Sequence, residues 1–168
     1  MNYLKISVGI FVALAVSRFV PHPPNFTSLL ALSFYVPAIL GMRFIPALIL
    51  SFLITDLIIG FHSVTFFTWG SVLFIGLFSK FFTLSAEKRV FGASLGACLF
   101  FIITNFGVWS LGSYGYSLEG LMACYTLAIP FFGQSILSTF IFSLVIELIY
   151  KVVKTKFLSN TQALNFKK

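Results

Sequence analysis

Residues 18–27 read R-F-V-P-H-P-P-N-F-T, a polar and proline-rich segment between two apolar runs. Its three prolines interrupt any continuous helix, because proline lacks an amide donor and disfavours helical dihedral angles at the residue before it. Only 9% of the residues in the chain are charged, yet this segment contains three side chains suited to polar contacts: Arg18, His22 and Asn25. We therefore expect a rigid loop that joins two helices and presents these side chains in fixed directions.

The composition predicts an integral membrane protein. Of the 168 residues, 59% are hydrophobic and 23 are phenylalanine, and the mean hydropathy is +1.04, whereas a soluble domain is about half apolar and about a quarter charged. The net charge is +7, but the basic residues stand at the ends of apolar runs and in the C-terminal tail. A nucleic-acid surface would interleave basic and aromatic residues on one face, so nucleic-acid binding is not expected.

Hydropathy and length predict an all-α membrane protein with six transmembrane helices. A span needs about 17 residues or more, and the candidate segments are residues 4–20, 25–42, 47–61, 65–82, 90–109 and 134–150. The apolar segment 119–132 is short and contains Pro130, which predicts a re-entrant or interfacial helix before the last span. The predicted organisation is a single membrane domain over residues 1–150 and a basic cytoplasmic tail over residues 151–168.

The distribution of charge predicts the orientation of the spans. Short cytoplasmic loops retain Lys and Arg, and with both termini in the cytoplasm every basic residue except Arg18 lies on the cytoplasmic side. This orientation brings residues 21–28, 60–63 and 112–132 to the outer face. The unusual polar residues gather there, which makes the outer face the candidate site.

Asp56 lies inside the third predicted span. An ionisable group at membrane depth costs about 2.5 to 3.5 kcal/mol on insertion scales, so it usually pairs with another group or faces a cavity. Its expected partner is Arg18, the one cation on the outer side. Two interpretations remain open: a purely structural ion pair, or a pair that forms the floor of a ligand cavity.

Further candidate ligand contacts lie on the other outer segments. His22 and His62 flank the expected cavity, and with Asp56 and Cys124 they could serve a soft metal ion, but loop histidines are more often hydrogen-bonded structure. No close spacing supports a metal, and Cys98 and Cys124 match no zinc or redox motif, so no metal site is predicted. An interfacial aromatic belt accounts for the tyrosines without a ligand; the remaining candidates are Asn105, Trp109 and Tyr125.

Small residues recur every four positions along the first predicted span, at Gly9, Ala13 and Ser17. Such a face lets a second helix approach closely, either inside this protein or on a partner subunit.

At the inner end of the last span, an i to i+4 pair with Lys151 accounts for Glu147. No hydrolase, zinc-protease, P-loop or dinucleotide motif is present, so an enzyme is not expected, and no cofactor is indicated.

Four sequence blocks carry a resemblance: R-F-V-P-H-P-P-N-F-T at 18–27, T-D-L-I-I-G-F-H at 55–62, I-T-N-F-G-V-W at 103–109 and G-L-M-A-C-Y-T-L-A-I-P-F-F at 120–132. Together they resemble an uncharacterised family of small bacterial inner-membrane proteins, over residues 18 to about 142. That family is in turn similar to the substrate-binding S components of energy-coupling factor (ECF) vitamin transporters. The resemblance implies an outward-facing site for a small molecule, with the ATPases on separate subunits. It also implies that the first helix contacts a transmembrane coupling subunit, although the face of Gly9, Ala13 and Ser17 departs from the alanine-based motif usual there.

Two functions follow as expectations. The first is a small-molecule binding subunit of a transporter in the bacterial inner membrane, with the outer loops as lid and walls. The second is an accessory structural subunit of a larger membrane complex, in which the outer polar cluster only fixes the fold. A cavity of about 300 Å³ or more at the cluster favours the first function.

Overall fold

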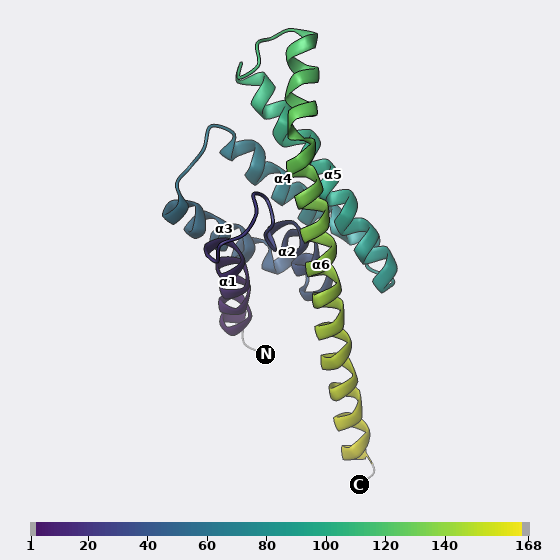
Figure 1. The fold of residues 1–168 in the computed structure, drawn as a ribbon. Helices are drawn as coiled ribbons and strands as arrows, with labels where there is room; N and C mark the ends of the chain where they lie inside the picture. The colour runs from purple at the N-terminus through teal and green to yellow at the C-terminus, as the bar shows by residue number, and fades with distance from the viewer. Residues whose placement is uncertain (1–2, 166–168) are drawn as a thin grey trace.

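The computed structural model describes the backbone of residues 3–165 and the side chains of residues 3–156. This part of the chain is all-helical and contains no strand. Two helices, α5 and α6, are much longer than the others (Figure 1). The helices are α1 (Tyr3–Phe19), α2 (Leu29–Tyr35), α3 (Ile45–Ile59), α4 (Thr65–Phe78), α5 (Ala86–Ser110) and α6 (Leu118–Asn165), with short π or 3-10 segments η1 (Val36–Leu40), η2 (Met42–Phe44) and η3 (Ser79–Phe82).

Helices α5 and α6 form an antiparallel hairpin whose closed end projects above the other helices (Figure 1). Helix α2 lies at the centre, because it contributes to both hydrophobic clusters of the described core. Leu29 packs with residues of α1, α3 and α4, whereas Phe34 packs with residues of α4 and α5. The fold is therefore one bundle built around a short central helix.

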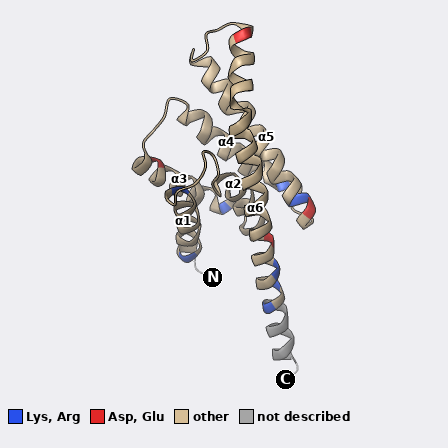
Figure 2. Ribbon diagram, viewed as in Figure 1, with Lys and Arg blue, Asp and Glu red and all other residues tan. Residues whose placement is uncertain are grey.

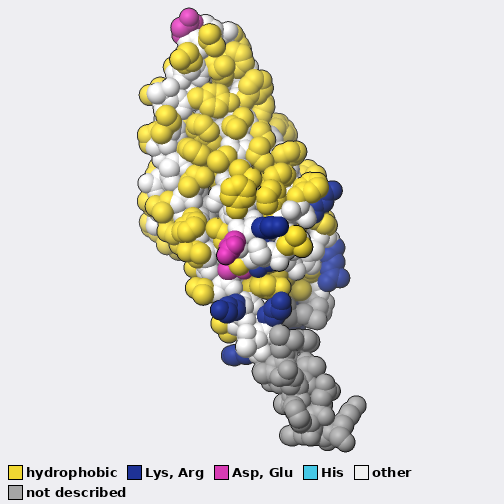
Figure 3. Space-filling model, turned by 90° about the vertical axis from the view of Figure 1, so that its right-hand side faces the viewer, with side chains coloured by type: hydrophobic (Ala, Val, Ile, Leu, Met, Phe, Trp, Pro, Cys, Tyr) yellow, Lys and Arg dark blue, Asp and Glu magenta, His cyan; other side chains and the backbone are white. Residues whose placement is uncertain are grey.

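Four helical segments among the described residues are long and apolar enough to cross a membrane. Figure 3 shows the corresponding surface: hydrophobic side chains cover most of the face in view, and Lys and Arg gather toward its lower part. Many large apolar side chains are exposed, among them Phe66 at 85%, as expected where lipid replaces water. The four candidate spans are Met42–Ile59, Thr65–Phe82, Ala86–Ser110 and Leu118–Lys156. Their length and the apolar surface indicate a membrane protein.

The second predicted span, residues 25–42, is shorter in the structure than expected. Seven α-helical residues and five π-helical residues give a helix of about 18 Å, whereas the hydrocarbon core is about 30 Å thick. Residues 25–28 belong to the preceding loop instead, and the helix ends at Gly41, whose φ of 99° leaves the helical region. The central helix is therefore too short to cross on its own.

The predicted break between residues 119–132 and the last span is wrong. Helix α6 continues through Pro130 as one helix from Leu118 to Asn165. Proline removes one backbone hydrogen bond, but a membrane helix tolerates this because the remaining bonds stay within the segment. The segment predicted as a re-entrant helix is instead the N-terminal part of α6, which packs against α5.

Candidate functional site

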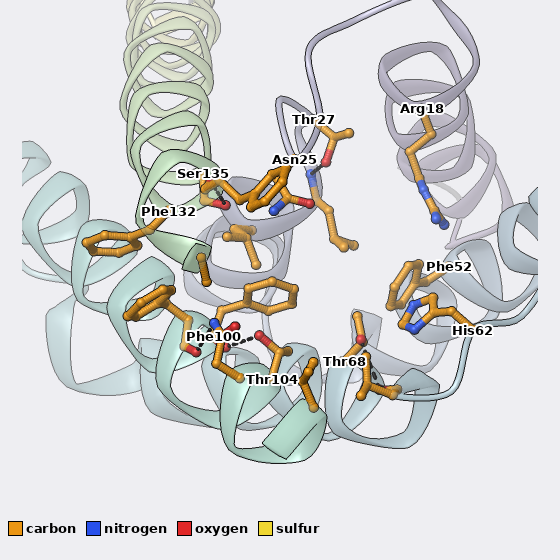
Figure 4. A pocket seen from close by; sticks show the side chains of 18 of the residues that line it. Arg18, Asn25, Thr27, Phe52, His62, Thr68, Phe100, Thr104, Phe132 and Ser135 are labelled. Carbon is orange, nitrogen blue, oxygen red and sulfur yellow. Dashed lines mark hydrogen bonds between the residues drawn. The ribbon is translucent and has the colours of Figure 1, made fainter. Parts of the chain in front are cut away.

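A cavity of about 430 Å³ lies where the proline-rich loop, the α3–α4 turn and the α5–α6 hairpin meet (Figure 4). In Figure 4, Arg18 and His62 project from one side, opposite Ser135 and Phe132 on the other. The cavity exceeds the roughly 300 Å³ lower bound of ligand pockets. Its polar lining residues are Arg18, His22, Asn25, Thr27, His62, Thr68, Thr104, Asn105 and Ser135.

Phenylalanine rings form a large part of the apolar wall. The rings of Phe101 and Phe132 lie 4.6 Å apart between centroids and join α5 to α6. Phe52 forms the opposite wall, beneath Arg18 (Figure 4). A pocket with aromatic walls and a few convergent polar groups is the usual form of a small-molecule site; the aromatic lining residues are Phe52, Phe100, Phe101, Phe131 and Phe132.

The structure confirms the predicted ion pair between Arg18 and Asp56. Arg18 Nη1 lies 2.6 Å from Asp56 Oδ1 and donates a hydrogen bond to Thr55 Oγ1. The second carboxylate oxygen, Oδ2, accepts a hydrogen bond of 2.7 Å from Trp69 Nε1, and the guanidinium lies 4.8 Å from the centre of the Phe52 ring. Asp56 is 2% exposed and does not line the cavity, so it neutralises and orients Arg18 from behind.

The proline-rich loop places its polar side chains at the cavity. The amide of Phe26 donates to the carbonyl of Pro23 at 3.0 Å, and His22 Nδ1 lies 2.7 Å from the same carbonyl oxygen. Asn25 adopts a φ of 64°, a left-handed conformation that Asn tolerates better than most residues. The N-cap of α2 is Ser28, so Asn25 does not cap this helix and its side chain remains available at the cavity.

Replacing His22 with Ala tests whether this loop contacts a ligand. His22 is exposed and its imidazole is hydrogen-bonded within the loop, to the carbonyl of Pro23, so we expect the midpoint of thermal unfolding to change little. A ligand that contacts the imidazole should bind more weakly to the variant. If His22→Ala binds a ligand of this cavity as tightly as the parent protein, His22 has no contact role.

His62 and Asn105 occupy the other sides of the cavity. His62 lies in the turn after Gly60, where Thr65 Oγ1 accepts from the His62 amide at 3.0 Å and donates to the His62 carbonyl at 2.6 Å. These bonds fix the backbone that carries the imidazole. Asn105 Nδ2 donates to the carbonyl of Phe101 at 2.8 Å, which satisfies part of the hydrogen-bonding capacity of its side-chain amide.

Besides Asp56, three predicted site residues lie outside the cavity, and these three stabilise the α5–α6 hairpin instead. Trp109 Nε1 donates to the carbonyl of Ser117 at 3.2 Å. Cys124 Sγ is hydrogen-bonded to the carbonyl of Asn105 at 3.4 Å, and Tyr125 donates its hydroxyl to the carbonyl of Ile102 at 2.7 Å. Within the described residues no three His, Cys, Asp or Glu side chains are grouped for a metal ion, so the four residues weighed as metal ligands do not come together.

Four polar lining residues were missed by sequence reasoning: Thr27, Thr68, Thr104 and Ser135. Serine and threonine are common in membrane helices, where they hydrogen-bond the carbonyl one turn earlier, and nothing in their spacing marks a site. Thr104 does this with Phe100 and Ser135 with Phe131.

The predicted small-residue face of α1 is divided between two environments. Ser17 faces inward, and its hydroxyl lies 2.7 Å from that of Ser28. Gly9 and Ala13 are exposed, and they border an apolar groove of about 410 Å³ between α1, α2 and α6. No other part of the described chain packs closely on Gly9, because a β-carbon there would meet no atom within 4 Å.

Glu147 does not pair with Lys151 as predicted. Its two carboxylate oxygens accept hydrogen bonds from Arg89 Nε and Nη2, each at 2.6 Å. Arg89 also donates to the carbonyl of Thr83 at 2.9 Å and is only 8% exposed. A bidentate hydrogen bond to a planar guanidinium is stronger than an exposed ion pair between two turns of one helix. Glu147 therefore pairs with Arg89 on another helix and not with Lys151.

The fold and the cavity define an all-helical membrane protein with a polar, aromatic-walled pocket. The chain belongs to a family of unknown function, DUF6580, whose model matches residues 2–164. Neither the comparison with curated proteins nor that with solved structures gave a match.

Proposed function

We propose that the protein binds a small, vitamin- or cofactor-like molecule from the outer side of the bacterial inner membrane, as the S component of an ECF transporter does. The observation that carries this proposal is the 430 Å³ cavity, which joins an aromatic wall to side chains from four separate segments. A polar cluster that only fixed the fold would be filled by its own side chains. The proposal includes binding and transfer but no catalytic step.

The charges at the cavity favour a neutral ligand with a ring. Among the described residues, Arg18 is the one Lys, Arg, Asp or Glu side chain that lines the cavity, and Asp56 balances its charge at 2.6 Å. The site therefore offers no net positive charge to an anion. Phenylalanine rings on opposite walls suit an aromatic or conjugated ring, and the imidazoles and amides suit polar groups at its edge.

The cavity can be tested by filling it. We expect Thr104→Phe, which puts a ring into the cavity, to abolish the ligand mass that native mass spectrometry detects on the protein purified from its own membranes. The matched control is Ile102→Phe, because Ile102 lies on the same helix but is 52% exposed toward the outside of the bundle. Loss of the adduct in both variants, or in neither, would contradict a ligand site in this cavity.

The orientation is a second expectation. We propose that both termini are cytoplasmic, because the basic side chains among the described residues gather at one end, with Arg18 as the exception (Figure 2). Reporters fused after Lys168, which lies outside the described residues, and within residues 112–117 should report opposite sides of the membrane. Reports from the same side would contradict the odd number of crossings that this orientation requires between the two positions.

A specific observation favours the alternative function, an accessory subunit of a larger membrane complex. Gly9 and Ala13 are exposed beside an apolar groove, where a helix of another subunit of such a complex could approach closely. Purification in mild detergent should then recover a stoichiometric membrane partner that Gly9→Leu loses. Recovery of a partner with no ligand adduct would favour the accessory role over the binding role.

A further inference from the structure

The buried face of α6 is polar over its middle third. Between residues 125 and 156, the buried positions of α6 are Ser135, Ser138, Thr139 and Ser143, and none of them is apolar. One turn further on, Glu147 binds Arg89. A membrane helix that only packed against its neighbours would bury apolar side chains among such residues.

Where this face meets α2, three buried hydroxyl groups form no well-aligned hydrogen bond within the described part of the protein: that of Tyr35 on α2 and those of Thr139 and Ser143 on α6. Each side chain is at most 2% exposed. The Tyr35 hydroxyl lies close to the Ser143 hydroxyl and the Glu147 carboxylate, which act on it as hydrogen-bonding neighbours without the alignment of a direct bond. We call Tyr35, Thr139 and Ser143 the hydroxyl seam, which lies between α2 and α6.

Small size alone does not account for the hydroxyl seam. Serine and threonine allow close helix packing, but elsewhere in this chain their hydroxyls bond the carbonyl four residues earlier, as Ser33, Ser71 and Ser94 do. Thr139 and Ser143 do not. Because an unsatisfied buried hydroxyl costs free energy, a bound molecule is the simplest partner, and water is the molecule that fits several convergent hydroxyls.

The hydroxyl seam runs along α6 from the outer cavity toward the Arg89–Glu147 ion pair. Ser135, one turn before Thr139, lines the outer cavity, and Glu147 lies one turn beyond Ser143. The distance along the helix from Ser135 to Glu147 is about 18 Å, which covers more than half of a hydrocarbon core. The seam thus leads from the outer cavity to the buried ion pair at the basic end of the bundle.

We propose that the hydroxyl seam holds a file of water molecules that continues the outer cavity toward the inner side, and that the Arg89–Glu147 pair closes its inner end. The inference rests on the proposed function, since in a transporter the file marks the inner half of the path that the bound molecule follows. Arg89 suits the closing role because it also holds the carbonyl of Thr83 and lies over the ring of Tyr150. Parting the ion pair would open the seam to the cytoplasm.

Silver ions test whether the seam contains water. Ag⁺ is small enough for a narrow aqueous path and binds thiolates, which form only where water solvates the sulfur. In a background with Cys98 and Cys124 replaced by Ala, we expect Ag⁺ added outside to block Ser143→Cys at least about tenfold faster than Ala93→Cys. The readout is the thiol that remains for a maleimide label after denaturation.

Ala93→Cys is a matched control because the two positions stand at the same depth. Ala93 lies one turn from Arg89 on α5, as Ser143 lies one turn from Glu147 on α6, and Ala93 is 0% exposed in an apolar cluster. If Ser143→Cys reacts no faster than Ala93→Cys from either side, the seam is dry and the proposal is overturned. The assay needs no ligand, so this failure is distinct from a failure of ligand binding.

The closing role of the ion pair has its own measurement. Arg89→Lys keeps the charge but loses the bidentate geometry, so in inside-out vesicles we expect Ag⁺ to block Ser143→Cys at least about tenfold faster in this variant, while Ala93→Cys stays unchanged. An unchanged rate for Ser143→Cys would overturn the assignment of Arg89 and Glu147 as the inner closure. Equal acceleration at both positions would indicate general loosening and overturn it as well.

Discussion

Asp56→Asn should lower the free energy of unfolding by about 3 to 5 kcal/mol in the presence of Arg18, because it leaves a largely buried guanidinium without its counter-charge. In an Arg18→Met background the same substitution should cost far less, since removing both charges can be nearly neutral. The two atoms that form the pair lie 2.6 Å apart, and the side chains are 14% and 2% exposed. The measurement is the thermal and denaturant stability of the four proteins of this double-mutant cycle.

A graded control separates the ion pair from the hydrogen bonds around it. Trp69→Phe removes the donor to the second carboxylate oxygen and retains both charges, so we expect a loss of about 1 to 3 kcal/mol. The loss should be similar whether or not Arg18 is present. Equal losses for Asp56→Asn in the two backgrounds would show that Arg18 and Asp56 do not stabilise each other, whatever their distance.

The sequence predicted this pair because both of its members were unusual where they stood. Asp56 is an acid within an apolar run, and Arg18 is the one cation at the outer ends of the predicted spans, so charge balance left a single combination. The helices that follow simple hydropathy were predicted closely as well: the run 65–82 corresponds to α4 and η3, and the run 90–109 lies within α5.

Other features depended on tertiary context that no local pattern contains. Pro130 predicted a break, but the lipid-facing helix tolerates it, so α6 continues. Glu147 had a suitable partner four residues away in Lys151, and nothing local indicated that Arg89, 58 positions earlier, would approach from another helix. The length of α2 was overestimated because the mostly polar residues 25–28 were counted into the span to reach the minimum length of a crossing, whereas in the structure they belong to the loop before α2.

The cavity was predicted in part, for a physical reason. Arg18, His22, Asn25, His62 and Asn105 were identified because charged, imidazole and amide groups are rare in a chain this apolar, and all five line the cavity. Thr104 and Ser135 were not, because a hydroxyl in a membrane helix satisfies itself on its own backbone and is common without a role. The aromatic walls were indistinguishable from the other phenylalanines, since 23 are spread over the whole chain.

The Arg89–Glu147 pair, at the other end of the bundle, should contribute as much to stability as the Arg18–Asp56 pair. We expect Glu147→Gln to cost about 3 to 5 kcal/mol of unfolding free energy, because it leaves Arg89 with one carbonyl and an aromatic ring in place of a carboxylate. Glu87→Gln is the matched control: Glu87 is exposed in the first turn of α5, where a carboxylate interacts only with the helix dipole, so the loss should stay below about 1 kcal/mol. The stability of both variants is measured by denaturant titration in the same detergent.

Charge reversal distinguishes pairing from packing at this position. Arg89→Glu alone places two carboxylates together and should be more damaging than Glu147→Gln, because like charges in a buried site repel strongly. Adding Glu147→Arg restores opposite charges with the positions exchanged, and we expect at least half of the lost stability to return, although the bond to the carbonyl of Thr83 cannot be remade from α6. A double variant no more stable than Arg89→Glu would show that the shape of the Arg89 pocket, and not the charge pair, holds α5 against α6.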